Sequence, residues 1–294
     1  MADGRITALV LAGRRDGVID PLAAAFGVED KCLVPIAGQP LIVHVLRALA
    51  SSPLVARIIV SINDPSLLAD LPIARELERA GRLVPLKAKD NLAESIFSAA
   101  EGIDFPLLVT TADNVLFTEH AVSEMHDQAC EGNADAAVAF SRRDDILAAH
   151  PDGQRRFYKF ADDAYSNCNC YWIRDASALS AAEVFRSGGQ FAKHPMRIAN
   201  AFGILNLIRF RLGLGSLADA FERFSSRLGL TLHPVIFADG ALAIDVDNAR
   251  THKIAGELLF TRMNDAPALS PQGPDITPGF RRLPEFRRQI GTRS

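Results

Sequence analysis

The chain has 294 residues, of which 48% are hydrophobic and 23% are charged. These proportions are typical of a soluble globular protein with a sizeable core, and the length accommodates one large α/β domain or two small ones. The formal net charge of −3 gives no overall attraction to nucleic acid or to an anionic membrane, so any phosphate site must depend on local cations.

The sequence shows no targeting or membrane-spanning pattern. Met1 to Arg5 lack the charged and apolar regions of a secretory signal, and no apolar run approaches the ~18 to 20 residues that cross a bilayer. The cysteines fit reduced thiols better than a disulfide framework, so we expect a cytoplasmic protein. They are Cys32, Cys130, Cys168 and Cys170.

Strands and helices alternate along the first half of the chain. The predicted strands are Ile6–Leu11, Arg57–Ile62, Leu83–Leu86, Pro106–Thr110 and Ala134–Phe140. The predicted helices are one that begins at Pro40, then Leu67–Ala80, Asn91–Glu101 (capped by Asn91) and Glu119–Cys130. Asp20–Val28 is either a short helix or part of a loop. This alternation predicts an α/β fold with a doubly wound, mostly parallel sheet, whose ligands bind at the carboxyl ends of the strands.

The second half of the chain has a less regular pattern. We expect an exposed loop at Arg142–Asp145 and a final helix at Thr251–Met263. Between them we predict the strands Arg156–Phe160 and Asn169–Ile173 as an antiparallel edge addition, the helix Leu179–Arg186, a mostly helical stretch Pro195–Leu228, and the strands Leu230–Phe237 and Ala241–Ile244. Residues 1–265 are thus predicted to form one domain, in which 141–240 is a smaller antiparallel and helical insertion. Residues 266–294 are predicted to be a tail.

The first strand ends at a turn of small residues. Ala12 and Gly13 are followed by Arg14, Arg15 and Gly17, so backbone N–H groups can approach a ligand closely and the arginines suit phosphate oxygens. An isolated pattern of this kind is more often structural. The first glycine of G-x-G-x-x-G is missing and no G-x-x-x-x-G-K-[ST] occurs, which disfavours a dinucleotide-binding dehydrogenase and a P-loop kinase.

Two carboxylates follow apolar runs, and one lysine precedes an apolar run. If Asp113 and Asp247 meet at one rim of the sheet, they could share a hard cation such as Mg²⁺. The alternative is that each caps the helix that follows it. Asp245 alternates with Asp247, so only one of the pair should face the rim if this segment is extended. Lys31 is either a phosphate partner or a solvated loop residue.

Taken together and in this order, these segments resemble the nucleotidyltransferase family of the sugar-phosphate and molybdenum-cofactor type. The resemblance covers roughly residues 6–260. It rests on Leu11-Ala12-Gly13 with Arg15 and Gly17, on the segment Lys31–Ile42, on Thr110–Asp113, and on Ile244–Thr251 before the last helix. The implied fold is Rossmann-like and similar to that of GT-A enzymes.

The resemblance also implies roles for particular residues. The loop would hold the triphosphate of an incoming NTP, with Arg15 and Lys31 on its oxygens and Asp113 and Asp247 holding Mg²⁺. Arg15, Lys31 and Asp113 would be the catalytic residues. The nucleotide-binding set would be Leu11, Ala12, Gly13, Arg15, Gly17, Lys31, Asn91, Ser95 and Asp113, in which Asn91 and Ser95 lie at the helix start that contacts the base and ribose.

The acceptor is expected to bind within residues 141–240. Strand alternation would aim Asn167 and Asn169 the same way, and Cys168 and Cys170 fit buried thiols better than a zinc site. Lys193, His194 and Arg197 form a cationic cluster that is either an acceptor-phosphate site or an exposed helix end. The apolar stretch 199–217 is most simply core, although it could contact a membrane surface or form a homodimer face.

The predicted function is that of a Mg²⁺-dependent nucleotidyltransferase. It would transfer an NMP unit from an NTP to a phosphorylated small-molecule acceptor and release pyrophosphate, with no nucleic-acid partner. One alternative is a GT-A-like glycosyltransferase that uses a nucleotide sugar, although Asp113-Asn114-Val115 supplies only one carboxylate where a D-x-D is usual. The other alternative is a non-catalytic nucleotide-binding protein.

Overall fold

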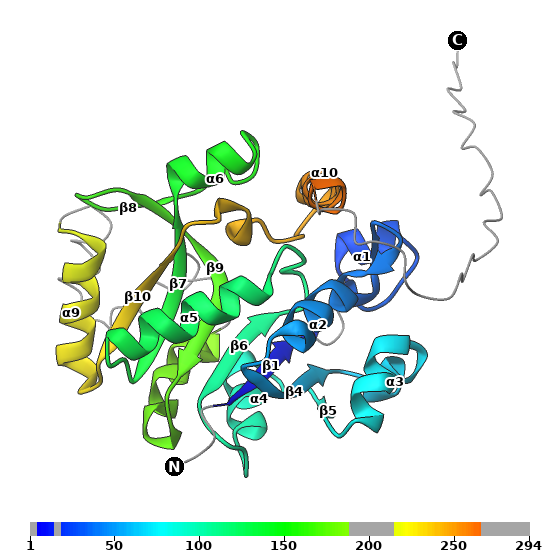
Figure 1. Cartoon of the computed structure of the whole chain (residues 1–294), viewed down its shortest axis with the longest axis horizontal. Coiled ribbons are helices and arrows are strands. Elements are labelled where there is room, and N and C mark those ends of the chain that lie inside the picture. Colours follow the sequence, from blue (N-terminus) through cyan, green and yellow to red (C-terminus); the bar gives the residue numbers. More distant parts are fainter. Residues whose placement is uncertain (1–4, 15–18, 188–214, 266–294) are drawn as a thin grey trace.

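A twisted central sheet organises the computed structural model, which describes residues 5–14, 19–187 and 215–265 (Figure 1). The strand order is β10-β7-β9-β6-β1-β4-β5, and β8 pairs with β9. The strands of this sheet are β1 (Ile6–Leu11), β4 (Val55–Ile62), β5 (Leu83–Lys87), β6 (Leu107–Thr111), β7 (Ala136–Arg142), β8 (Tyr158–Lys159), β9 (Ala164–Ile173) and β10 (Leu232–Phe237). A separate small hairpin joins β2 (Pro35–Ile36) to β3 (Gln39–Pro40).

Helices cover both faces of this sheet. The α-helices are α1 (Pro21–Ala25), α2 (Leu41–Ser51), α3 (Pro72–Arg79), α4 (Leu92–Ala99), α5 (Glu119–Glu131), α6 (Arg143–Ala149), α9 (Leu217–Leu228) and α10 (Ala249–Asp265). Short 3₁₀ segments are η1 (Lys31–Leu33), η2 (Pro65–Asp70), η3 (Ala176–Ser187) and η4 (Gly240–Ala243). None of the helices in the described part of the chain is both long enough and apolar enough to span a membrane.

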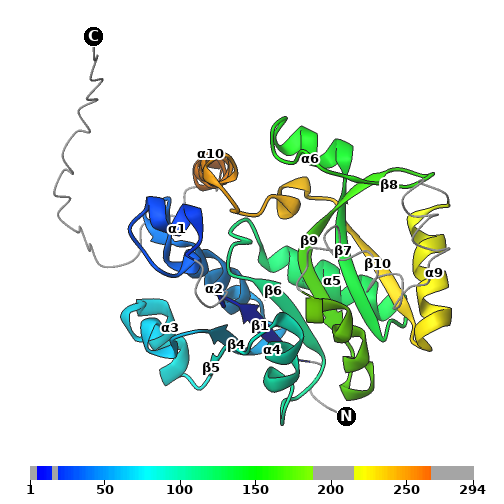
Figure 2. The ribbon, with the colours of Figure 1, turned by 180° about the vertical axis from the view of Figure 1, so that it is seen from behind.

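Strand β1 shows why the sheet is covered on both sides. All of its residues are buried. Ala8 and Val10 pack into the same core as α2 and α5, whereas Leu9 and Leu11 pack into the core that contains α4. Figure 1 shows α2 and α5 in front of the strands, and the reverse view in Figure 2 shows α4 in front of them. A strand buried on both faces needs a continuous apolar run, which is the pattern of residues 6–11.

The fold confirms the predicted class: it is α/β, with a mostly parallel sheet. The antiparallel strand, however, is not an edge addition. β9 lies between β6 and β7 and is antiparallel to both, so the edges of the sheet are β10 and β5. Periodicity in a sequence identifies a strand but not its neighbours, because these depend on how the intervening segments pack.

Two further local predictions are wrong. Arg142 ends β7 and α6 begins at Arg143, where a loop was expected; Asp144 and Asp145 in the first turn complement the helix dipole. Ala241–Ile244 is not a strand, because Gly240–Ala243 forms the 3₁₀ segment η4. Short apolar runs do not distinguish a strand from a buried turn.

Residues 20–28, predicted as either a short helix or part of a loop, include a short helix. The segment forms α1, whose first turn is closed by the Asp20 side chain accepting from the backbone N–H groups of Leu22 and Ala23. The predicted helix Leu67–Ala80 is divided into η2 and α3 at Pro72. Residues 188–214 and 266–294, which include most of the predicted helical stretch and the predicted tail, lie outside the described residues.

Candidate active site

The turn after β1 is held by an asparagine from the neighbouring strand. Asn63, directly after β4, accepts the backbone N–H of Arg14 at 2.6 Å and donates from Nδ2 to the Arg14 carbonyl at 3.3 Å. A Cβ on Gly13 would lie 3.0 Å from the Ala88 Cβ and 3.4 Å from Asn63 Oδ1. A glycine at this position therefore allows the chain to pass between the end of β4 and the segment after β5. The turn lies at the carboxyl edge of the sheet.

The arginine that begins the predicted phosphate loop is engaged within the protein. The Arg14 guanidinium lies 3.3 Å from Glu29 Oε2 and 3.4 Å from Asp30 Oδ1. Burial raises the pKa of Asp30, and Arg14 opposes this shift. Arg14 thus ties the turn to the segment that carries Lys31. Arg15 and Gly17, predicted to contact the triphosphate, lie outside the described residues.

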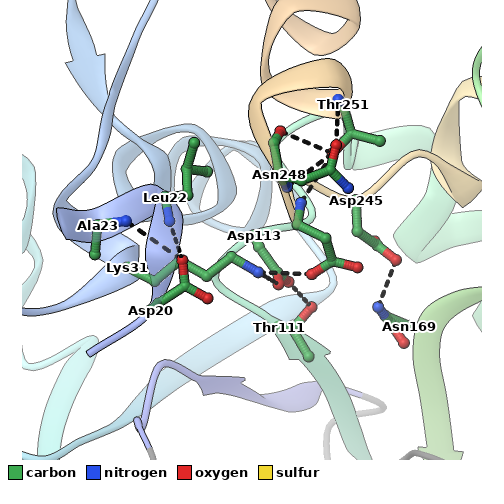
Figure 3. A network of polar contacts seen from close by, with 11 residues as sticks. Asp20, Leu22, Ala23, Lys31, Thr111, Asp113, Asn169, Asp245, Asn248 and Thr251 are labelled. Carbon is green, nitrogen blue, oxygen red and sulfur yellow. Dashed lines mark hydrogen bonds and ion pairs between the residues drawn. The ribbon is translucent and has the colours of Figure 1, made fainter. Parts of the chain in front are cut away.

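At the centre of the site, Lys31 joins two carboxylates from distant parts of the chain (Figure 3). Its Nζ lies 2.6 Å from Asp113 Oδ2 and 2.7 Å from Asp247 Oδ1. The other Asp113 oxygen, Oδ1, accepts from the Thr111 hydroxyl at 2.5 Å. The side chains of Lys31 and Asp113 are each 20% exposed, and that of Asp247 is 65% exposed. The predicted convergence of these residues at one rim is therefore present in the structure.

The charge balance favours the protonated lysine. Burial alone would lower the pKa of Lys31, but the neighbouring carboxylates of Asp113 and Asp247 outweigh burial and raise it. The lysine is thus an ammonium ion clamped between two carboxylates. It is not a solvated loop residue.

Neither Asp113 nor Asp247 caps a helix, so the alternative prediction that each caps the helix after it is wrong. Thr118 caps α5, and Asn248 Oδ1 accepts from the N–H groups of Arg250 and Thr251 at the start of α10. The Thr251 hydroxyl in turn accepts the backbone N–H of Asp247 at 2.9 Å. The cap of α10 thus fixes the backbone of Asp247 while its carboxylate faces Lys31.

Asp245 also belongs to the site, which the sequence did not predict. The segment is not extended: the Asp247 N–H donates to the Asp245 carbonyl at 3.0 Å, and the Val246 N–H donates to the Asp113 carbonyl at 3.0 Å. This tight turn brings both acids of the pair close to Asp113. Burial first, and then the charges of Asp113 and Asp247, raise the pKa of Asp245.

Strand β9 contributes a polar row beside Asp245. Asn169 Nδ2 donates to Asp245 Oδ2 at 2.7 Å, and Asn169 adopts a left-handed backbone conformation with φ of 47°. The Tyr171 hydroxyl lies 3.3 Å from Asn167 Oδ1 and 3.3 Å from Asn169 Oδ1. Asn167 and Asn169 therefore lie on the same side of the strand, as predicted. The side chain of Asn169 supports Asp245.

The buried side of β9 carries the two cysteines. Cys168 and Cys170 are free thiols with no exposed surface, and burial raises the pKa of both. They fit the prediction of buried strand thiols. Cys32 and Cys130 are also free. Lys193, His194 and Arg197 lie outside the described residues, as does the stretch 199–214.

The residues predicted to contact the base and ribose have internal partners. Asn91 caps α4 by accepting the N–H of Glu94 at 3.0 Å, as predicted. The buried Ser95 hydroxyl accepts the backbone N–H of Lys89 at 3.0 Å. Both side chains shape the loop that follows β5, whose Ala88 packs against Gly13.

The donor set fits a hard divalent cation. The Lys31 ammonium is a cation already in contact with one oxygen of Asp113 and one of Asp247, which shows that both carboxylates converge on a single positive centre. Magnesium binds through one or two protein carboxylates and takes its other ligands from phosphate and water. Within the described ranges, no set of three His, Cys, Asp or Glu side chains is arranged to hold a metal by itself.

Sequence reasoning missed Asn63 and Asp245 as site residues. Asn63 follows the apolar strand β4, as Gly13 follows β1 and Asp113 follows β6, so its position at a strand end was an available signal. An extended segment would place only one of Asp245 and Asp247 at the rim, whereas the turn in the structure places both there.

Comparison with known families identifies the type of domain. The family model of the MobA-like NTP transferase domain matches residues 8–257, which is most of the chain. No curated protein sequence matches. The resemblance drawn from the sequence motifs is confirmed.

Solved structures share the fold. A hypothetical transferase from Thermus thermophilus matches with a TM-score of 0.69 and 24% identity over 84% of this chain and 99% of that chain. A 4-diphosphocytidyl-2C-methyl-D-erythritol synthase from Anaerococcus prevotii matches with a TM-score of 0.53 and 12% identity, covering 88% and 97%. A CMP:2-keto-3-deoxy-manno-octonic acid synthetase complexed with CTP matches with a TM-score of 0.50 and 12% identity, covering 88% and 99%. These similarities confirm the Rossmann-like nucleotidyltransferase fold.

Proposed function

Because the chain belongs to the family of MobA-like NTP transferase domains and is a nucleotidyltransferase, we propose that it transfers an NMP unit from an NTP to a phosphorylated small molecule. Pyrophosphate would be the second product, and Mg²⁺ the cofactor. The observation that carries this proposal is the contact of Lys31 with Asp113 and Asp247 at the carboxyl edge of the sheet. Ligands of open α/β sheets bind at this edge.

The nucleotide would lie across the turn after β1. The backbone of Gly13, together with Arg15, Gly17 and Lys31, would receive the triphosphate. Leu11 and Ala12 would line the binding site from the end of β1, where the Ala12 N–H donates to the Ser61 carbonyl and the Leu11 carbonyl accepts from the Ala112 N–H. The close packing of Gly13 against Ala88 and Asn63 supports this role, because a side chain at Gly13 would push on these neighbours and displace the turn that would receive the phosphates. Asn91 and Ser95 would help to bind the base and ribose by fixing the conformation of the loop after β5.

Asp113 and Asp247 would hold Mg²⁺, which when bound offsets the negative charge of the phosphates. The rest of the chemistry is positioning. An oxygen of the acceptor phosphate attacks the α-phosphorus in line, a new P–O bond forms, and the bond to the leaving pyrophosphate breaks. An ionised phosphate is already a nucleophile, so this reaction needs no side-chain base. Arg15 and Lys31 would stabilise the charge that accumulates on the transferred group.

The acceptor would bind on the β9 side of the site. Asn167 and Asn169 would line that side, and Lys193 and Arg197 would contribute charge to the acceptor phosphate. Two of the structural neighbours bear the names of enzymes that form cytidylyl products, and one of them was solved with CTP. Their names support a nucleotide as the donor for this chain, and a sugar or a phosphorylated compound as the class of acceptor.

The proposal is tested in two steps. Thermal unfolding with each of the four NTPs and Mg²⁺ identifies the donor, because a ligand stabilises the native state according to its occupancy. Pyrophosphate release is then measured with that NTP and a panel of sugar, polyol, cofactor and lipid phosphates. We expect release with at least one acceptor. Nucleotide binding without turnover would favour a non-catalytic protein, and turnover of nucleotide sugars would favour a glycosyltransferase.

The substitution Asp113→Asn is the site control. It keeps the size of the side chain but removes the charge that faces Lys31, so turnover should fall to background while the unfolding temperature changes little. Asp127→Asn, at an exposed position on α5, is the matched control and should retain full activity. Near-normal turnover of Asp113→Asn would remove Asp113 from the catalytic site.

A further inference from the structure

Lys31 contacts the two carboxylates, Asp113 and Asp247, that would hold Mg²⁺ in the proposed function. Both oxygens of Asp113 are already engaged: Oδ2 contacts Lys31 Nζ at 2.6 Å and Oδ1 accepts from Thr111 at 2.5 Å. Asp247 directs Oδ1 at the same ammonium from 2.7 Å. A divalent cation at these oxygens would lie next to the ammonium, and the repulsion between two cations at such short range disfavours metal binding while the ammonium is in place.

Lys31 is well suited to leave this position. Its side chain is a flexible four-carbon stem that ends in a point charge, and it extends from the short 3₁₀ segment η1, with 20% of the side chain exposed. The ammonium gives up two carboxylate contacts when it leaves, so it needs another anionic partner. The triphosphate of the nucleotide, which the proposed function places beside Lys31, is such a partner.

We infer that Lys31 is a built-in counter-ion that occupies the cation position between Asp113 and Asp247, and that the nucleotide opens this position to the metal by drawing Lys31 onto its phosphates. Metal and nucleotide binding are thereby coupled, and each raises the affinity for the other by the same factor. This inference rests on the proposed function. It adds that Lys31 weakens metal binding in the absence of nucleotide, a role opposite to its help in binding phosphate.

The test measures Mn²⁺ binding to the nucleotide-free protein by the EPR signal of free Mn²⁺. Lys31→Met removes the charge and keeps the length of the side chain. We expect it to bind Mn²⁺ more tightly than the wild type by about 5- to 150-fold, the usual range of coupling between two binding events. Adding nucleotide should then raise the Mn²⁺ affinity of the wild type more than that of Lys31→Met.

Three variants control for charge and for the site. Lys31→Arg keeps a cation at this position and should bind Mn²⁺ as weakly as the wild type. Lys253→Met removes an exposed lysine whose Nζ lies 3.7 Å from Glu257, so the net charge changes equally and the affinity should not change. Adding Asp113→Asn to Lys31→Met should abolish the gain. Thermal unfolding establishes that each variant is folded.

Two results would overturn the inference in distinguishable ways. If Lys31→Met binds Mn²⁺ no more tightly than the wild type while Asp113→Asn weakens binding, Lys31 does not compete with the metal, and the proposed metal site stands. If Asp113→Asn leaves the Mn²⁺ affinity unchanged with and without nucleotide, the metal site itself is wrong, and the inference fails together with that part of the proposed function.

Discussion

At the scale of single residues, Asn63 fixes the turn that follows β1. It makes hydrogen bonds to both the N–H and the carbonyl of Arg14, and its Oδ1 lies close to where a Gly13 Cβ would be. One amide side chain thus fixes the turn after β1 at the point where the predicted triphosphate loop begins. Preorganised backbone groups bind an anion more tightly because less ordering is needed on binding.

Asn63→Ala is expected to weaken nucleotide binding without unfolding the protein. The loss of two hydrogen bonds, one at 2.6 Å and one at 3.3 Å, leaves the turn less ordered, and we expect the Kd for NTP to rise about tenfold, which corresponds to about 1.4 kcal/mol. Isothermal titration calorimetry with the preferred NTP measures this change. Ser66→Ala, which loses only the hydroxyl contact to Asp64 in the next turn, is the control. An unchanged Kd in Asn63→Ala would mean that the turn does not contact the nucleotide.

Asp245 is the second residue whose local environment is unusual. Its Oδ1 is buried and has no hydrogen-bond partner among the described residues, although Oδ2 is held by Asn169. A buried carboxylate oxygen without a partner costs stability, and such costs concentrate at functional sites. Burial and the charges of Asp113 and Asp247 raise the pKa of Asp245, which favours its neutral form more than in an ordinary exposed aspartate.

At the scale of elements, the acidic turn before α10 depends on how closely η4 packs on α6. A Cβ on Gly240 would overlap the backbone of Asp145 and Ile146, so the two segments touch main chain to main chain. η4 leads directly into Ile244 and Asp245, and a shift of η4 would therefore move the carboxylates that face Lys31. Glycine is required here by close approach, since its φ is not positive.

Substitution of two glycines tests this packing. Gly240→Ala should lower the free energy of unfolding by about 1–3 kcal/mol or more, because the added methyl group has no room. Gly256→Ala, in the middle of α10, meets nothing closer than Ile36 Cγ1 at 3.8 Å and should raise the free energy of unfolding by about 0.5–1 kcal/mol. Urea unfolding of both variants provides the measurement. Equal effects of the two substitutions would contradict the close contact between η4 and α6.

At the scale of the whole molecule, the sheet brings together residues that are far apart in the chain. Lys31, Asp113 and Asp247 come from η1, from the end of β6 and from the segment before α10, and they meet at one rim because the parallel strands share a direction. The order of the strands therefore determines which loops become neighbours, and so which residues form the site.

The pH dependence of stability is a property of the whole molecule. Burial lowers the pKa of His44 on α2 and of His233 on β10 below the ordinary value of 6.5, and Arg47 adds to the shift of His44. The folded protein then binds fewer protons than the unfolded chain just below pH 6.5. Each histidine therefore lowers the free energy of unfolding as the pH falls through 6.5 toward its folded pKa.

The double substitution His44→Gln and His233→Gln removes this contribution. Between about pH 7.5 and pH 5, the free energy of unfolding should fall less in the variant than in the wild type, as measured by urea unfolding at both pH values. His120→Gln, at an exposed position on α5, is the matched control. A constant difference between variant and wild type over this range would show that neither histidine is linked to folding.

The local sequence was sufficient for most of the elements and for the positions of Lys31, Asp113 and Asp247. The apolar run of β1, the Asn91 cap of α4, the positions of Asp113 and Asp247 after apolar segments and that of Lys31 before one were predictable, because burial on two faces, capping and strand ends leave patterns within a few residues. The family resemblance followed from the same segments. The roles of Arg15 and of the acceptor-side cations stay predictions.

Only the tertiary structure decided which segments are neighbours. The insertion of β9 between β6 and β7, the contact of Asn63 with Arg14 and the tight turn that adds Asp245 to the site all depend on residues far apart in the chain. Although it misassigned residues 142–145 and 241–244, the sequence by itself determined most of the strands and helices, since these preferences are local. The sheet then determined which of them face one another, because strand order and close packing are set by the burial of the whole core.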